Sequence, residues 1–228
     1  MTAAGAIVPL LTGFCAPQSV LDVGCGAGAM LATFAAAGLV DLVGLDDDAV
    51  DAGVFCCDPT FITRVDLAQP FDLGRRFDLV VSLEVAEHLS KDHARAFVAS
   101  LVRHGDVILF SAAIPGQGGV NHVNEQWQSW WAEIFGSMGF RCLDVIRPVI
   151  WNEAAMPIWY KQNAFLYVKE GVATPVVPAE PWPLDLAHPL IVDRPLRLRV
   201  GEASVELVRS ARRSLTYWSG RARQRQRR

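Results

Sequence analysis

The run of residues from Leu21 to Gly28, Leu-Asp-Val-Gly-Cys-Gly-Ala-Gly, constrains the fold more than any other part of the chain. Apolar residues lead into it and an alanine-rich stretch follows it, which predicts a strand, a glycine loop and then a helix. Glycine is needed where a backbone turns tightly or lies close to a ligand. The helix after the loop presents unpaired N–H groups and the positive end of its dipole. This run therefore predicts a ligand-binding turn at the carboxyl end of the first strand.

Predicted strands and helices alternate along the chain, which is typical of an α/β fold with a Rossmann-like, doubly wound sheet that is mostly parallel. In such sheets, ligands bind at the carboxyl ends of the strands. The predicted strands are Val20–Val23, Leu42–Leu45, Phe61–Val65, Phe77–Leu83, Val107–Ala112, Phe140–Ile146 and Ala164–Lys169. The predicted helices are a leading segment Thr2–Cys15, then Ala29–Ala37, Asp92–Arg103 and Asn124–Met138, and Glu84–Leu89 is expected to begin a turn or helix.

Length and proline content predict the domain organisation. The 228 residues suit one domain with an appendage, and six prolines fall within residues 171–200. Residues 1–170 are predicted to form the domain and 171–200 a C-terminal proline-rich linker or wrapping arm. Residues 201–228 are predicted to form a basic amphipathic helix with a tail.

Charge divides the chain into two unlike parts. The segment Arg209–Arg228 holds eight arginines and no acidic residue, so the rest of the chain has a net charge of −11. An acidic body is a poor nucleic-acid binder. The basic segment has the pattern of a helix on an anionic membrane surface, with packing against the protein and nucleic-acid contact as alternatives.

Cysteine usage and hydropathy predict the compartment. The five cysteines are scattered and form no C-x-x-C pair, which favours reduced thiols. No apolar run approaches the roughly 20 residues that a membrane span needs. We therefore expect a cytoplasmic protein, with peripheral contact at the inner membrane face as an option.

Acidic residues at the predicted strand ends indicate which ligand the glycine loop binds. Asp22 stands just before the loop, where a carboxylate suits a cationic group such as an amine or a sulfonium better than a pyrophosphate. Asp46 follows Gly28 by 18 residues and can accept hydrogen bonds from ribose hydroxyls. Asp66 can accept from an adenine amino group while Leu67 packs on the ring.

These segments resemble the motifs of class I S-adenosylmethionine (SAM)-dependent methyltransferases over residues 15–170. Residues 22–28, 43–46, 65–67 and 77–82 resemble the first four motifs of that family in order. The resemblance implies a seven-stranded sheet with a reversed final strand, and SAM as the methyl donor. The cofactor-binding residues expected from the loop, the strand ends and this resemblance are Asp22, Gly24, Cys25, Gly26, Gly28, Asp46, Asp47, Asp66, Leu67 and Ser82.

A Glu-x-x-Glu-His sequence follows the fourth strand. Positions i, i+3 and i+4 of a helix share one face, so Glu84, Glu87 and His88 are expected to converge. Two carboxylates and an imidazole suit Mg²⁺, Mn²⁺, Fe²⁺ or Zn²⁺, and His122 after the fifth strand can supply a fourth ligand. The arrangement resembles the metal-dependent small-RNA 2′-O-methyltransferases of the Hen1 family, although their RNA-binding modules and basic groove have no counterpart here.

Three interpretations of this cluster stay open. A divalent metal can chelate two adjacent hydroxyls of the acceptor and lower the pKa of one of them. Without a metal, His88 or His122 can act as a general base. In a purely structural role, Glu84 caps a helix, Glu87 is solvated and His88 is a structural residue whose hydrogen bonds are satisfied. We take His88, His122 and Glu87 as the candidate catalytic residues.

The loops around the cluster indicate which kind of molecule accepts the methyl group. Residues 114–123 and 148–163 are expected to form the loops that lie over the substrate site. Aromatic faces stack on sugar rings, and an amide can bind a polyol, so Asn121, Trp151, Trp159 and Tyr160 are candidate acceptor-binding residues. We expect O-methylation of a glycan, a glycosylated metabolite or another small hydroxylated molecule. The alternatives are a Hen1-like RNA 2′-O-methyltransferase and a non-catalytic partner subunit with a SAM fold.

Overall fold

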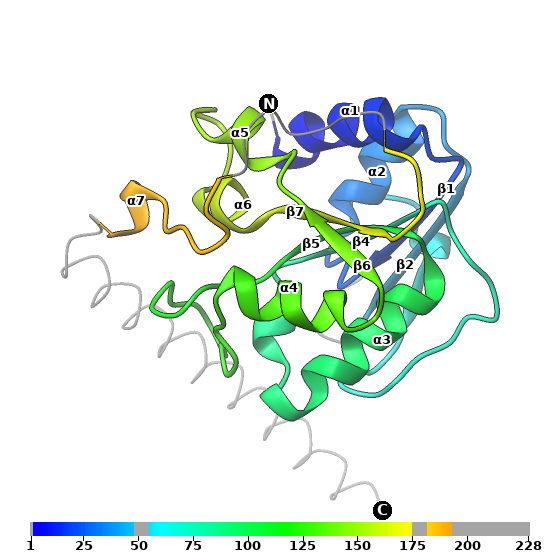
Figure 1. The fold of residues 1–228 in the computed structure, drawn as a ribbon. Helices are drawn as coiled ribbons and strands as arrows, with labels where there is room; N and C mark the ends of the chain where they lie inside the picture. Colours follow the sequence, from blue (N-terminus) through cyan, green and yellow to red (C-terminus); the bar gives the residue numbers. More distant parts are fainter. Residues whose placement is uncertain (1, 48–54, 175–181, 193–228) are drawn as a thin grey trace, which may run out of the picture. The chain divides into compact units, whose positions relative to one another are not determined.

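A computed structural model describes residues 2–47, 55–174 and 182–192 (Figure 1). The chain divides into two compact units, residues 1–188 and 189–228. Of the second unit, the structure describes only the short helix α7 (Pro189–Val192). The helix and tail predicted over 201–228 lie outside the described residues.

A seven-stranded sheet forms the centre of the first unit, with the strand order β3-β2-β1-β4-β5-β7-β6. Neighbouring strands are parallel except for β7, which runs antiparallel to β5 and β6. This confirms the predicted Rossmann-like sheet with its reversed final strand. The strands are β1 (Ser19–Val23), β2 (Asp41–Asp46), β3 (Ile62–Arg64), β4 (Leu79–Leu83), β5 (Val107–Ser111), β6 (Phe140–Leu143) and β7 (Phe165–Lys169).

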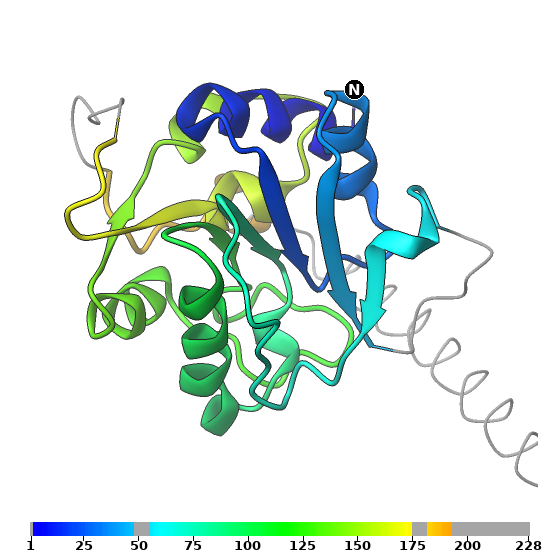
Figure 2. The ribbon, with the colours of Figure 1, turned by 90° about the vertical axis from the view of Figure 1, so that its right-hand side faces the viewer.

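Helices cover both faces of the sheet (Figure 2). Alternate residues of a strand point to opposite faces, so Val80 of β4 packs in one core while Leu79 and Val81 pack in the other. The core with Val80 also contains residues of α3 and α4, and the other contains residues of α1 and α2. The helices are α1 (Ala3–Cys15), α2 (Ala29–Ala36), α3 (Ala94–His104), α4 (Gln128–Gly136), α5 (Arg147–Ile150) and α6 (Ile158–Asn163), with 3-10 turns η2 (Pro59–Phe61), η3 (Ala86–His88) and η4 (Lys91–His93).

Two predicted elements were too long. The strand predicted to reach Ile146 ends at Leu143, because the chain turns there into α5, where the buried Arg147 pairs with Asp144 at 2.6 Å. The helix predicted from Asn124 begins only at Gln128, because the preceding backbone makes long-range hydrogen bonds. Within the described residues, no helix is long and apolar enough to cross a membrane.

Residues 182–188 lie against α4 and α5 as part of the first compact unit. The buried guanidinium of Arg147 donates to the carbonyl oxygens of Pro183 and Leu184 at 2.9 and 3.0 Å. The Ser129 N–H donates to Asp185 at 2.8 Å. The compact unit therefore extends past residue 170, the boundary that proline content predicts, and takes in part of the predicted arm.

Candidate active site

The loop between β1 and α2 depends on three glycines with positive φ, Gly24 at 79°, Gly26 at 54° and Gly28 at 77°. Side chains rarely tolerate this region of φ. Two of the glycines are also closely packed, since a Cβ on Gly24 would lie 2.2 Å from Val85, and a Cβ on Gly28 would lie 2.3 Å from the Cys57 sulfur. The loop therefore has its predicted form, and its backbone stays open to a ligand.

Acidic side chains from the ends of β1 and β2 lie at this loop. The Gly26 N–H donates to the Asp46 carboxylate at 2.5 Å, and the Asp47 N–H donates to the other Asp46 oxygen at 2.8 Å. Asp22 is buried, and burial, followed by the charge of Asp46, raises its pKa to about 7. A cation bound nearby would favour the Asp22 carboxylate, as expected for a site that binds a sulfonium or an amine.

The remaining predicted cofactor-binding residues lie on the strands beside the loop. Asp66 follows Val65, whose N–H donates to the Asp46 carbonyl at 2.8 Å, while Leu67 is buried in the core. Ser82 is fully buried, and its Oγ has no hydrogen-bond partner within the described part of the chain. Cys25 contributes backbone to the loop, but its side chain packs in the opposite core, against Gly44.

The segment after β4, predicted to begin a turn or helix, forms a short turn. Glu84 has a φ of 55°, and only Ala86–His88 form a 3-10 turn. The Glu84 N–H donates to the carbonyl and to the hydroxyl oxygen of Ser111, each at 3.0 Å, and this ties the turn to the end of β5. No helical turn includes Glu84, so the predicted helical face does not form, although the Glu84 and Glu87 side chains still interact with each other.

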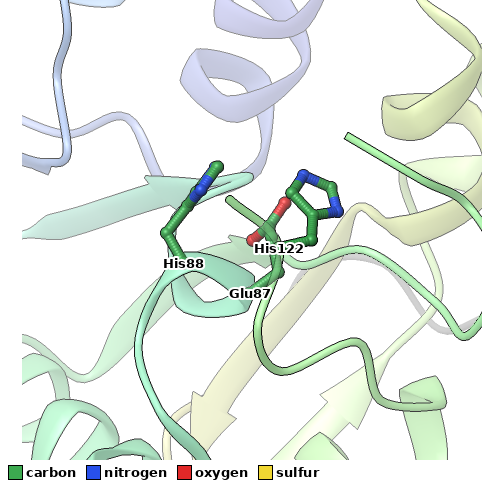
Figure 3. Close-up of side chains that lie close together, drawn as sticks. All are labelled: Glu87, His88 and His122. Atoms are coloured by element: carbon green, nitrogen blue, oxygen red, sulfur yellow. The ribbon is translucent and has the colours of Figure 1, made fainter. Parts of the chain in front are cut away.

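Glu87, His88 and His122 form a group whose potential ligand atoms lie within 4.8 Å of one another (Figure 3). The Glu87 side chain is fully buried, and neither carboxylate oxygen has a hydrogen-bond partner among the described residues. Its carbonyl oxygen accepts from the N–H groups of Val123 and Asn124 at 2.9 and 3.1 Å, which fixes the His122 loop against η3. The structure thus brings together three of the four predicted metal ligands, without Glu84.

The surroundings of these groups alter their protonation. Burial, followed by the nearby charge of Glu84, raises the pKa of Glu87 to about 9. Burial, followed by the charge of His122, lowers the pKa of His88, while backbone hydrogen bonds with Asn121 and Val120 act in the other direction. At neutral pH, His88 is therefore neutral, the form that binds a metal or accepts a proton, and Glu87 holds a proton unless a cation stabilises its charge.

Sequence analysis missed Glu125, which holds His122. The Glu125 carboxylate lies 2.9 Å from His122 Nδ1 and accepts from the N–H groups of Gly116 and Gly118 at 2.7 and 2.8 Å. A carboxylate partner keeps the proton on Nδ1 and leaves Nε2 as the free ring nitrogen. The spacing His-x-x-Glu was the available signal. Gly119 gives the ring its space, because a Cβ there would lie 2.2 Å from His122 Nε2.

Glu84 belongs to a buried amide network that the sequence did not reveal. Its carboxylate accepts from Gln117 Nε2 at 2.9 Å and from Asn163 Nδ2 at 3.2 Å. Gln162 in turn donates to the side-chain oxygens of Gln117 and Asn163, each at 3.0 Å, and accepts from the His188 N–H at 2.8 Å. Burial raises the pKa of Glu84, and the hydrogen bonds from Gln117 and Asn163 act in the opposite direction.

The candidate acceptor-binding residues separate into two groups. Tyr160 lies close to the site: burial, followed by the charges of Glu84, Asp22 and Glu87, raises the pKa of its hydroxyl to about 12. Trp159 precedes it and is exposed, and Asn121 lies next to His122 with a φ of 58°. Trp151 contacts the rings of Trp182 and His188, with centroids 5.1 and 4.5 Å away, so it packs beneath the arm.

A family model described as a methyltransferase domain matches residues 4–143. The chain belongs to this methyltransferase family. Its match covers more than half of the chain and includes the glycine loop, the acidic strand ends and all of the Glu87, His88 and His122 group. A search of curated proteins found no match to the methyltransferase.

Solved structures show the same fold. The sugar N-methyltransferase KedS8 from Streptoalloteichus is 15% identical with a TM-score of 0.55, and the alignment covers 74% of this chain and 87% of that one. The amino pentose methyltransferase CalS10 from Micromonospora echinaspora is 18% identical with a TM-score of 0.52, covering 73% and 89%. The methyltransferase domain of a bacterial Hen1 is 18% identical with a TM-score of 0.51, covering 73% and 96%. The sheet is that of the class I SAM-dependent methyltransferases.

The loop of this methyltransferase fits SAM. The backbone at Gly26 is open, because a Cβ there would meet nothing within 4 Å among the described residues, whereas Gly24 and Gly28 pack against Val85 and Cys57. Burial and the charge of Asp46 raise the pKa of Asp22, and a cationic group bound beside it would stabilise its carboxylate. The roles of Asp46 on the ribose and of Asp66 and Leu67 on the adenine stay predictions. When bound, SAM supplies the methyl group.

Proposed function

We propose that this methyltransferase methylates a hydroxyl of a glycan, a glycosylated metabolite or another small hydroxylated molecule, with a divalent metal held by Glu87, His88 and His122. The observation that carries the proposal is the Glu87 carboxylate. It is fully buried, its oxygens have no hydrogen-bond partner among the described residues, and two imidazoles lie within 4.8 Å.

The residues of this group fit a divalent ion. Buried charges in proteins are paired or coordinate metals. A set of two histidines and one carboxylate leaves coordination positions open for ligands from a substrate. His122 is oriented by Glu125, in the way that a carboxylate hydrogen-bonded to a metal-binding histidine fixes the direction of its ring. A bound divalent ion would supply a lowered pKa for a hydroxyl that it chelates.

The remaining side chains favour a hydroxylated acceptor at this position. The charges of Glu84 and Asp22 act on the Tyr160 hydroxyl, and such a hydroxyl can donate to or accept from a polyol. Each oxygen of Glu84 accepts one amide hydrogen and has a second lone pair for an acceptor hydroxyl. The acidic body of the chain favours a neutral or cationic acceptor over a polyanion.

The proposal is tested by S-adenosylhomocysteine release with a panel of glycosides and polyols, before and after EDTA and with Mg²⁺, Mn²⁺, Fe²⁺ or Zn²⁺ added back. We expect turnover that EDTA abolishes and one of these ions restores. Glu87→Gln should abolish both turnover and metal binding, while Glu133→Gln, an exposed glutamate of α4, serves as the matched control. Full turnover in EDTA, or in Glu87→Gln, would refute the role of the metal.

Methylation of an amino sugar is a second candidate. The charges of Asp22, Glu84 and Glu87 all act on the Tyr160 hydroxyl, and such a site suits an ammonium group. Two of the similar structures are named as sugar or amino pentose methyltransferases. The same panel separates the candidates when it includes amino sugars and an RNA 3′ end. Metal-independent methylation of an amine would favour the second candidate.

A further inference from the structure

Three exposed apolar side chains, Val120, Val123 and Trp127, lie around His122 in the sequence, and we call them the apolar rim. Their exposed fractions are 40%, 64% and 41%. Exposed apolar residues that are scattered singly need no explanation, but grouped ones mark binding surfaces. These three fall within eight residues that also contain a candidate ligand of the metal.

Backbone contacts place the apolar rim at the site. The Val123 N–H donates to the Glu87 carbonyl at 2.9 Å, and the Val120 backbone is hydrogen-bonded to the His88 ring. Trp127 follows His122 by five residues, so its Cα lies no more than about 18 Å from that of His122. Val120 and Val123 therefore border the Glu87, His88 and His122 group, and Trp127 lies within reach of it along the chain.

The rim is held in its exposed position by the same contacts that build the site. Glu125 accepts from two loop N–H groups and from His122, and the Gln126 N–H donates to the Ala113 carbonyl at 3.1 Å. A loop fixed in this way cannot turn its valines into the core without breaking the His122 contacts. Its apolar surface is thus available to a ligand at no cost in loop ordering.

We infer that the acceptor is amphipathic, with a hydroxylated head that reaches Glu87, His88 and His122 and an alkyl or aryl aglycone that lies on the apolar rim. The inference rests on the proposed function and specifies its substrate class. A polar centre bordered by apolar side chains matches a molecule with the same two parts. A free sugar would leave the rim in water.

The test is a series of alkyl glycosides that differ only in chain length, from methyl to octyl, kept below their micelle concentrations. Glucosides, galactosides, mannosides and rhamnosides are each assayed by S-adenosylhomocysteine release. Burial of one methylene changes an equilibrium constant by about fourfold. We expect the KM of a turned-over sugar series to fall by up to about fourfold per methylene over the first few methylenes.

Rim variants assign the effect to these residues. Val123→Ser and Trp127→Ala should flatten the dependence of KM on chain length. Val40→Ser is the matched control, because Val40 is 86% exposed and precedes β2, and it should keep the native dependence. Size-exclusion chromatography over a range of concentrations checks whether the rim instead binds a second copy of the chain.

The outcomes are distinguishable. Turnover with a KM that is independent of chain length, or a native chain-length dependence in both rim variants, overturns the inference and leaves the proposed function in place. Dimerisation that Val123→Ser abolishes, with a flat KM series, assigns the rim to self-association and also overturns the inference. No methylation of any glycoside overturns the proposed function, and the inference with it.

Discussion

Gly119 offers the sharpest test of the site, because it controls the position of His122 without being a candidate ligand. A Cβ at residue 119 would lie 2.2 Å from Nε2 of the His122 ring, 2.4 Å from Cε1 and 2.8 Å from Cδ2. Ordinary van der Waals contact begins at 3.4 Å, so in Gly119→Ala the ring must retreat by about 1.2 Å. Retreat strains the 2.9 Å contact of Nδ1 with Glu125.

The expected result is a metal affinity that falls by about 10- to 100-fold, the usual effect of disturbing the partners that orient a ligand. This corresponds to about 1.4–2.7 kcal/mol of binding free energy. Titration calorimetry with Mn²⁺ or Zn²⁺ measures it, and urea unfolding in EDTA shows whether stability is retained. Gly136→Ala in α4 is the matched control, because nothing lies within 4 Å of a Cβ there and its φ is ordinary.

A double-mutant cycle removes the remaining ambiguity. If the clash with the ring causes the loss, Gly119→Ala should cost nothing further in a His122→Ala background, since the ring is no longer there. Additive losses, or native metal affinity in Gly119→Ala alone, would show that His122 is not a ligand in the position described.

Three further outcomes follow from contacts of the site. In EDTA, the free energy of unfolding should fall as the pH rises from about 4.5 to about 9, because native Glu87 keeps a proton that the unfolded chain releases. Urea unfolding at pH 5 and pH 8 measures this fall, which should be smaller in Glu87→Gln. Asn163→Ala leaves one Glu84 oxygen without its amide donor, and urea unfolding should show a loss of about 1–3 kcal/mol. Gly28→Ala should abolish SAM binding in calorimetry, whereas Gly38→Ala, at a positive φ but in open space, should lower only stability, by about 1 kcal/mol.

The sheet and the donor loop were predictable because their signals are local. A buried parallel strand is a short apolar run, and the first four runs here are followed by Gly24, Asp46, Asp66 and Glu84, which mark the carboxyl edge. The glycine loop needs positive φ values that few other residues adopt, so its sequence specifies its shape. The family match then agrees with the donor that these residues predict.

The acceptor side was less predictable because long-range contacts form it. The spacing of Glu84, Glu87 and His88 predicts one face only if a helix begins at the strand end. The Glu84 N–H instead bonds to Ser111, which is 27 residues away, and the turn that follows is a short 3-10 turn. The amides of Gln117 and Asn163 likewise act on Glu84 through long-range contacts that no local pattern encodes.

Glu84 and Glu87 lie in different environments, which suit them to different chemical roles. Glu84 and Glu87 are three residues apart, and the charge of Glu84 raises the pKa of Glu87, whereas the interaction with Glu87 lowers the pKa of Glu84. Around Glu84, amide dipoles run in one direction: the His188 N–H bonds to Gln162, Gln162 to Gln117 and Asn163, and these to the carboxylate. Such aligned hydrogen bonds reinforce one another and stabilise a negative charge at their end.

Glu87 receives no such donors, and the potential ligand atoms beside it belong to His88 and His122. A charge on Glu87 is therefore stable only when a cation is present, whereas a charge on Glu84 is already supported by protein groups. The metal and the acceptor then have separate carboxylates to bind. On this argument, a matched pair of substitutions should separate the two functions: Glu87→Gln should remove metal binding, while Asn163→Ala should raise the KM for the acceptor and leave metal affinity close to native.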